Sequence, residues 1–79
     1  MGYVQVEYDE EADAIAVHLS EPQGAVVTED FGPGRYVDYD ATGAVVGVEF
    51  IGVSRGISVD GLPEAERVRR ALNAIPRPV

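Results

Sequence analysis

The chain contains no cysteine and no lysine, and its apolar runs are short. Without cysteine it can form no disulfide, no cysteine-ligated zinc site and no thiol nucleophile. No apolar run is long enough to span a membrane, and no basic start followed by a long apolar stretch marks a signal peptide. We therefore expect a cytoplasmic protein with no membrane partner.

The small size of the chain limits its core. Its 79 residues make one domain, 1–79. A domain of this size buries only about 60% of the surface that its unfolded chain exposes, and such domains often need disulfides, a metal or a partner chain. Because disulfides are excluded, the sequence favours self-association, with a homodimer as the first choice.

Charge is unevenly distributed along the chain, whose net charge is −8. Residues 1–53 hold 11 acidic side chains and one arginine, whereas residues 54–79 hold three acids and five arginines. A strongly acidic body argues against binding of a nucleic-acid backbone. The basic C-terminal part is expected to pair with an acidic sheet, in its own chain or in a neighbour's.

Period-2 alternation of apolar residues predicts five strands. They cover residues 3–8, 14–20, 25–31, 35–40 and 44–53. The acidic segment 9–13 predicts a hairpin turn between the first two strands, and Asp40-Ala41-Thr42-Gly43 predicts another between the last two. The third strand is expected either to lie at an edge of the sheet or to contain a bulge, and the fifth is expected near the centre. The sequence leaves the strand order open.

A helix is predicted within residues 60–75, because Ala65, Val68, Leu72 and Ile75 recur at helical spacing. Residues 76–79 are expected to form a loose tail after Pro76. The predicted fold class is α+β: a five-stranded, mainly antiparallel β-meander over residues 3–53, followed by one C-terminal helix packed on the sheet.

Three segments resemble one known family. They are Tyr8-Asp9-Glu10-Glu11-Ala12-Asp13-Ala14-Ile15, then Val37-Asp38-Tyr39-Asp40 with Gly43, then Val46-Gly47-Val48-Glu49-Phe50-Ile51. Their order is similar to that in the domain of unknown function 2283 family, short bacterial and archaeal proteins, over roughly residues 3–54. The resemblance implies a small β-meander with a terminal helix and supplies no activity, cofactor or catalytic residue. Some relatives are thought of as partners of toxin-like proteins. Ala16 departs from the family pattern, in which many relatives carry a larger side chain.

The acidic turn is the first candidate site. Asp9, Glu11 and Asp13 alternate along the chain, a pattern that is compatible with ligands of Ca²⁺ or Mg²⁺. An EF-hand loop starting at Asp9 would require glycine and glutamate where the chain has Ala14 and Ser20, so that motif is rejected. The alternative interpretation, which we favour, is a solvated hairpin tip.

The second candidate site is a pair of carboxylates. Asp38 and Glu49 flank the Gly43 turn and are expected on the same face of the sheet, where two close carboxylates would raise one pKa for acid catalysis. His18 is the only histidine. A nucleophilic serine activated by it would have to be Ser20, Ser54 or Ser58, of which Ser20 shares its strand face. The alternative is that Asp38, Glu49 and His18 are surface or interface residues without catalytic roles.

Arg67, Arg69 and Arg70 form the basic patch of the predicted helix, beside Val68 and Leu72. This patch is too small to predict nucleic-acid binding, so we take these five residues as interface candidates.

Three functional hypotheses follow, none of which calls for a cofactor. The first is a non-enzymatic, self-associating module. The second is an antitoxin-like module that binds a basic protein partner. The third is a small carboxylate-based hydrolase or metal-binding protein.

Overall fold

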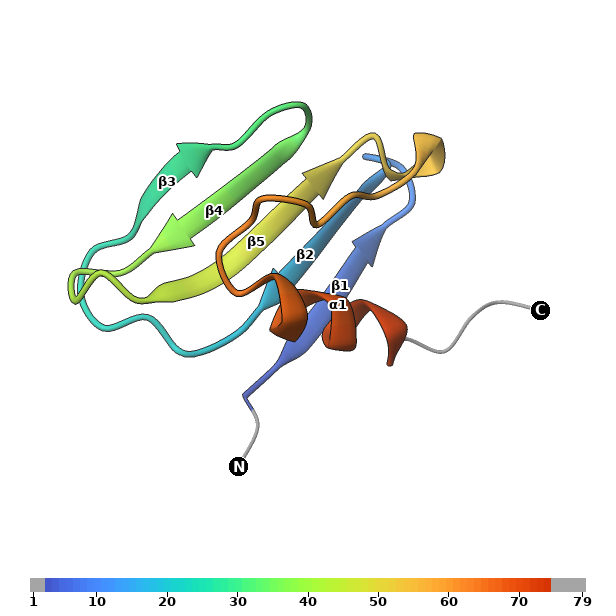
Figure 1. Ribbon diagram of the computed structural model, residues 1–79. Coiled ribbons are helices and arrows are strands. Elements are labelled where there is room, and N and C mark those ends of the chain that lie inside the picture. Colours follow the sequence, from blue (N-terminus) through green and yellow to red (C-terminus); the bar gives the residue numbers. More distant parts are fainter. Residues whose placement is uncertain (1–2, 75–79) are drawn as a thin grey trace.

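The computed structural model describes residues 3–74, which form one five-stranded sheet and one α-helix (Figure 1). The strands are β1 (Gln5–Asp9), β2 (Ala14–His18), β3 (Val27–Asp30), β4 (Arg35–Tyr39) and β5 (Val45–Ile51). A short 3-10 helix, η1 (Val53–Arg55), follows β5, and the α-helix α1 is Ala65–Asn73. No helix among these residues is long and apolar enough to cross a membrane.

All four strand pairings are antiparallel, and the strand order is β1-β2-β5-β4-β3. The predicted α+β fold, with an antiparallel sheet followed by one helix, is therefore confirmed. The strand order, which the sequence left open, joins the β1–β2 hairpin to a β3–β4–β5 meander through the β2–β5 pairing. The segment between β2 and β3 passes around the end of the sheet to its far edge (Figure 1).

One face of the sheet carries the core. Val17 and Val48 face each other across β2 and β5, Val37 continues the row on β4, and these three side chains are almost fully buried. α1 and the segment that leads to it lie on this face, which we call the helix side (Figure 1). Val68 and Ala71 of α1 join this core, so the helix packs on its own sheet.

β5 is the central strand, as its apolar pattern predicted, and it contains a bulge. Asp38 pairs with Gly47, but Tyr39 pairs with Val45, so Val46 is the extra residue on β5. The carbonyl oxygen of Val46 accepts hydrogen bonds from the backbone N–H groups of Leu19 and Ser20. The bulge therefore fixes the segment after β2 to the middle of the sheet.

β3 lies at an edge of the sheet, which is one of the two alternatives that its pattern predicted, and all four of its residues are exposed. It is short and carries Glu29 and Asp30, two features by which edge strands avoid pairing with other chains.

The helix begins at Ala65, later than the expected start at residue 60. Leu62 is buried, its N–H donates to the carbonyl oxygen of Val59, and Gly61 is left-handed with φ 78°. Glu64 is also left-handed, with φ 58°, so helical backbone cannot extend upstream of it. Burial of Leu62 in a turn therefore takes the place of the predicted first helical turn. The expected helix end at residue 75 and the tail at 76–79 lie outside the described residues.

Candidate functional site

The face of the sheet opposite α1, which we call the open face, carries most of the acidic side chains of the strands. Strand alternation places Glu7, Asp9, Asp30, Asp38 and Glu49 on it. Arg35 is the one arginine within the five strands, and its side chain reaches the backbone of Ser58 and Asp60 on the helix side. The strands therefore give the open face a negative charge that none of their arginines offsets.

A row of paired residues crosses the open face and has a small residue in its middle. Glu7 of β1 pairs with Ala16 of β2, which pairs in turn with Glu49 of β5. Neighbouring strands lie about 4.8 Å apart, so the backbones that carry the two glutamates are separated by roughly 10 Å. Because alanine does not fill the space between them, the surface is hollowed above β2.

This hollow, which we call the acidic trough, has a volume of about 290 Å³. Ala14 and Ala16 form its floor, and Glu7, Asp9, Glu49 and Ile51 are among the residues that line it. Glu49 and Ile51 are exposed on one side, and Glu7 and Asp9 are exposed on the other. A cation held above Ala16 would lie between two carboxylates.

The three candidate catalytic residues, Asp38, Glu49 and His18, share the open face, but their contacts do not form a catalytic group. His18 Nε2 lies 3.2 Å from Glu7 Oε1, and Thr28 Oγ1 donates to Asp38 Oδ1 at 2.5 Å. Asp38 is opposite Gly47 and Glu49 is opposite Tyr36, so the two carboxylates are diagonal neighbours on adjacent strands. The trough takes in Glu49 but neither Asp38 nor His18.

The serines considered as nucleophiles have other contacts. Ser54 Oγ donates to Asp13 Oδ2 at 2.8 Å, and Ser58 Oγ accepts from the N–H of Asp60 at 3.2 Å. Among residues 3–74, neither these two serines nor Ser20 forms a hydrogen bond with His18, so the geometry does not support a Ser–His pair.

The acidic turn is held by its own carboxylates. Asp9 Oδ1 accepts from the N–H of Ala12 at 3.1 Å, and Asp13 Oδ1 accepts from the N–H of Ser54 at 2.9 Å. The carbonyl oxygen of Asp13 also accepts from the N–H groups of Gly52 and Val53. Glu11 is exposed. Asp13 therefore binds the start of η1, and residues 3–74 contain no group of three or more histidine, aspartate or glutamate side chains placed to hold a metal ion.

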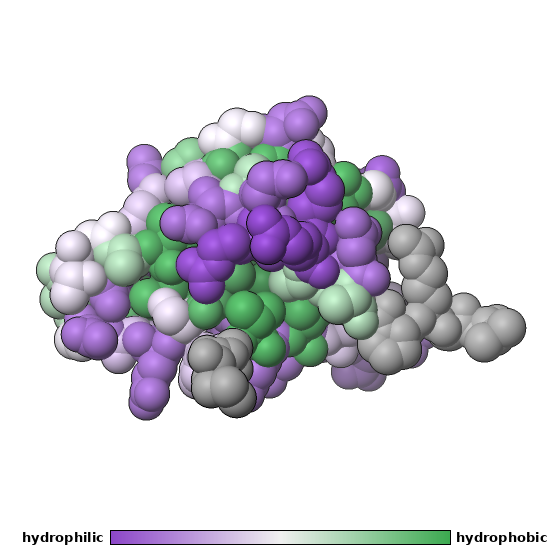
Figure 2. Space-filling model, turned by 60° about the horizontal axis from the view of Figure 1, so that its bottom comes forward, coloured by the Kyte–Doolittle hydropathy of each residue, from purple (hydrophilic) through white to green (hydrophobic). Residues whose placement is uncertain are grey.

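The interface candidates on α1 divide into two groups. Val68 is fully buried in the chain's own core and Leu72 packs against that core, so Val68 is not available to another chain. Arg67 donates to the carbonyl oxygen of Leu19 at 3.1 Å, and Arg69 pairs with Glu66. Arg69 and Arg70 are exposed on the outer surface of the helix. Figure 2 shows a strongly hydrophilic group of side chains in the middle of this view, bordered by apolar surface.

Asp40 is a buried carboxylate that sequence reasoning assigned only to a turn. The Thr42 hydroxyl donates to its Oδ1 at 2.6 Å, and the N–H of Gln23 donates to its Oδ2 at 2.9 Å. These hydrogen bonds, with two more from the N–H groups of Thr42 and Ala44, hold the pKa of Asp40 below its ordinary value against the opposing effect of burial. Asp40 thus fixes the turn before β5 to the segment after β2.

Sequence reasoning missed the trough itself. Glu7 was not singled out, Ala14 and Ile51 were named only in the family segments and the rejected EF-hand motif, and Ala16 was noted only for its small size. The signal that would have found them is the register of β1, β2 and β5, which puts two alanines between two rows of longer side chains.

Comparison with known proteins identifies one relationship. The sequence model of the family described as "Protein of unknown function (DUF2283)" matches residues 5–54. This range runs from the start of β1 into η1, so it contains the whole sheet, the acidic turn and the acidic trough. No curated protein matches the chain. No solved structure matches it either.

Proposed function

The chain belongs to the DUF2283 family of proteins of unknown function, and from this premise we propose that it is a protein-binding module whose open face holds a basic partner. The observation that supports this proposal is the row Glu7–Ala16–Glu49, in which two exposed carboxylates flank a gap. A guanidinium group in that gap would form charge-assisted hydrogen bonds with both carboxylates.

The shape of the open face suits a protein partner better than a small substrate. Its carboxylates lie on an exposed sheet surface. Exposed side chains line the trough between them, so the trough is shallow. Acid–base catalysis is favoured where burial or a close like charge shifts a pKa. Complementary charge on an open surface instead favours fast, salt-sensitive association with a partner of opposite charge.

A titration with a synthetic peptide tests the proposal. The probe is a short peptide that alternates arginine and serine, and its control replaces each arginine with glutamine. The protein's backbone amide resonances are followed by NMR. We expect saturable shifts at Ala14, Ala16 and Glu49 with the arginine peptide, and weaker binding as salt concentration rises.

Matched variants locate the binding. Replacing both trough glutamates, Glu7→Gln with Glu49→Gln, should weaken the binding at least about tenfold, because two charge-assisted contacts are lost. Replacing two exposed turn glutamates, Glu10→Gln with Glu11→Gln, removes the same charge outside the trough and should leave most of the affinity. Equal losses in the two variants, or shifts away from the open face, would overturn the proposal.

A second copy of the chain is the second candidate partner. Arg69 and Arg70 lie on α1, on the opposite side of the sheet from the trough, so they cannot reach the trough of their own chain. The helix of another copy would bring them to it in a head-to-tail contact. Two open faces, in contrast, would repel one another. Sedimentation equilibrium tests this candidate, and a strict monomer at micromolar concentration would remove it.

A further inference from the structure

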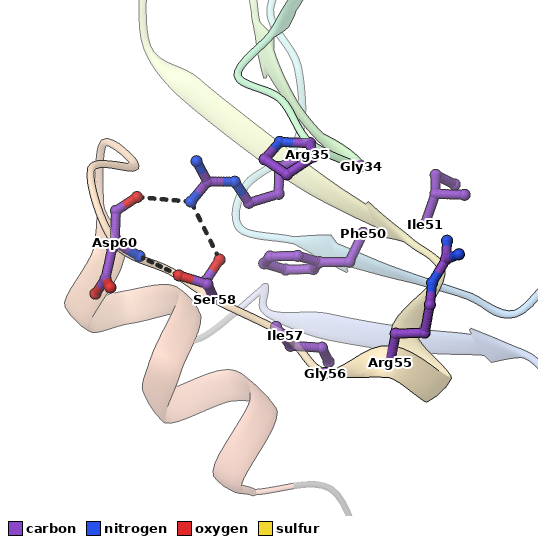
Figure 3. Close-up of a pocket in the computed structure, with 10 residues that line it drawn as sticks. Gly34, Arg35, Phe50, Ile51, Arg55, Gly56, Ile57, Ser58 and Asp60 are labelled. Atoms are coloured by element: carbon purple, nitrogen blue, oxygen red, sulfur yellow. Dashed lines mark hydrogen bonds between the residues drawn. The ribbon is translucent and has the colours of Figure 1, made fainter.

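We propose that a second hollow, at the end of the sheet where β5 leaves it, binds an organic carboxylate that carries an apolar group. This hollow has a volume of about 430 Å³ and is lined by Gly34, Arg35, Ile51, Arg55, Ile57 and Ser58, among others (Figure 3). We call it the arginine pocket. Its volume lies within the range of about 300–1,000 Å³ that is typical of small-molecule sites.

Arg35 builds one wall of the arginine pocket. Its Nε donates to the carbonyl oxygen of Gly32 at 2.8 Å, and its Nη2 donates to that of Phe31 at 3.1 Å. Its Nη1 donates to the carbonyl oxygens of Asp60 at 2.6 Å and Ser58 at 3.3 Å. These contacts tie the 58–60 segment to the turn before β4. All four acceptors are neutral carbonyl groups, so the positive charge of Arg35 is held in place without being neutralised.

Arg55 stands on the other side of the pocket, on η1 (Figure 3). Its guanidinium group packs over the backbone of Gly52, where an added Cβ atom would lie only 2.6 Å from Nη2. Glycine at position 52 therefore leaves the room that the guanidinium occupies. Among residues 3–74, no carboxylate lies within ion-pair distance of Arg55 or Arg35. In a chain of net charge −8, two such cations beside one hollow mark a site for an anion.

The other lining residues indicate the chemistry of the anion. Ile57 lines the pocket and is 40% exposed, so an apolar group that covered it would remove apolar surface from water. Arg35 already donates to four backbone carbonyl groups, so Arg55 is the residue of the pocket whose planar fork can match the two oxygens of a carboxylate. Asp60 also lines the pocket, but its backbone carbonyl faces Arg35 and its carboxylate points away from that guanidinium (Figure 3). The pocket thus combines unneutralised positive charge with an exposed apolar wall.

This inference is independent of the acidic trough, whose charge has the opposite sign. The two hollows share only Ile51 among their lining residues. A ligand of one is therefore not expected to bind the other.

Titration of the full chain with benzoate tests the inference, with backbone amide NMR as the readout. We expect saturable shifts at Gly34, Gly56 and Ile57. Inorganic phosphate supplies charge without an apolar group, and benzyl alcohol supplies the apolar group without charge, so both should bind at least about tenfold more weakly than benzoate. Binding of phosphate as tight as that of benzoate would overturn the assignment.

Two variants complete the test. Arg55→Gln removes one charge and should weaken benzoate binding at least about tenfold. Arg70→Gln removes an exposed arginine from α1 and should leave the binding unchanged. The amide spectrum of each variant reports whether it is folded. If Arg55→Gln disturbs η1, the variant Ile57→Glu takes its place in the test. It puts a negative charge on the pocket wall and should therefore abolish benzoate binding. Shifts elsewhere in the chain, unsaturable shifts, or equal affinity in wild type and Arg55→Gln would overturn the proposal.

Discussion

Asp13 and Ser54 are joined by two hydrogen bonds although they lie 41 residues apart, one to the N–H of Ser54 and one to its hydroxyl group. Asp13 has φ 54°, a left-handed conformation that aspartate and asparagine adopt more readily than most residues. This contact connects the acidic turn of the first hairpin to the end of the central strand. The structural role of Asp13 thus accounts for the aspartate at this position of the motif that carries the family resemblance.

Replacing Asp13 should therefore lower stability. We expect Asp13→Ala to reduce the free energy of unfolding by about 1–2 kcal/mol, because the N–H of Ser54 loses its acceptor. Asp13→Asn keeps one acceptor and tolerates the backbone conformation, so its loss should be smaller. Urea unfolding measures both, and Glu11→Ala in the same turn is the control, with a change within about 0.5 kcal/mol. Equal effects of Asp13→Ala and Glu11→Ala would contradict the assigned role.

Asp40 predicts how stability depends on pH. Its pKa in the folded chain lies below the ordinary value of 3.8, first because of the Thr42 hydroxyl and then because of the Gln23 N–H. The folded state therefore binds this proton less readily than the unfolded state does. The stabilisation from Asp40 is present above pH 3.8 and is lost as pH falls through the lower, folded-state pKa.

Thr42→Val tests this explanation, since it removes the hydroxyl group that has the largest effect on the pKa of Asp40. The pKa of Asp40, followed by NMR titration of its carboxyl carbon, should rise towards the ordinary value. Urea unfolding of the variant should lose the Asp40 contribution at a higher pH than in wild type. An unchanged titration would show that the hydroxyl does not stabilise the carboxylate.

Phe50 and Ile51 are adjacent residues on opposite faces of β5, which gives a matched test of where the core lies. Phe50 is 2% exposed and Ile51 is 48% exposed. Phe50→Ala should cost about 3–5 kcal/mol, since it removes a large buried side chain and leaves a cavity. Ile51→Ala should cost about 1 kcal/mol or less. Thermal and urea unfolding measure both, and a comparable loss from Ile51→Ala would mean that the open face is covered.

Ala16→Leu tests the shape of the acidic trough without changing its charge. Leucine should occupy the gap between Glu7 and Glu49 and weaken binding of the arginine peptide at least about tenfold, because the cation would no longer reach both carboxylates. The position faces solvent, so stability should change by about 0.5 kcal/mol or less. Ala25→Leu, at an exposed position outside the trough, is the control and should bind as wild type does. Full binding by Ala16→Leu would show that the gap is not used.

Local sequence patterns were sufficient to predict most of the fold. Alternation along Ile15 and Val17, and along Val46 to Phe50, identified the strands and the central place of β5, because the period of side chains in a strand is a local property. The strand order was beyond such reasoning, since it depends on which strand β2 meets. The start of α1 was misplaced because burial of Leu62, a long-range effect, overrides the local preference for a helix beginning near Pro63.

The candidate site likewise contains features that local patterns predict and features that depend on long-range contacts. Alternation predicted that Asp38 and Glu49 share one face, in agreement with the register of β4 and β5. It could not reveal that Asp13 bonds to Ser54, or that Arg35 bonds to the backbone of residues 58 and 60, because these contacts join distant parts of the chain. The trough required the register of three strands, and one shift in register would have removed it.

Affinity capture tests the central claim most directly, with three forms of the protein as bait in lysate from cells in which the chain is native. The forms are wild type, the trough variant Glu7→Gln with Glu49→Gln, and the turn variant Glu10→Gln with Glu11→Gln. We predict that wild type and the turn variant retain the same partner, identified by mass spectrometry as a protein with a basic surface, and that the trough variant loses it. Retention of that partner by all three forms, or a partner without a basic surface, would contradict the claim.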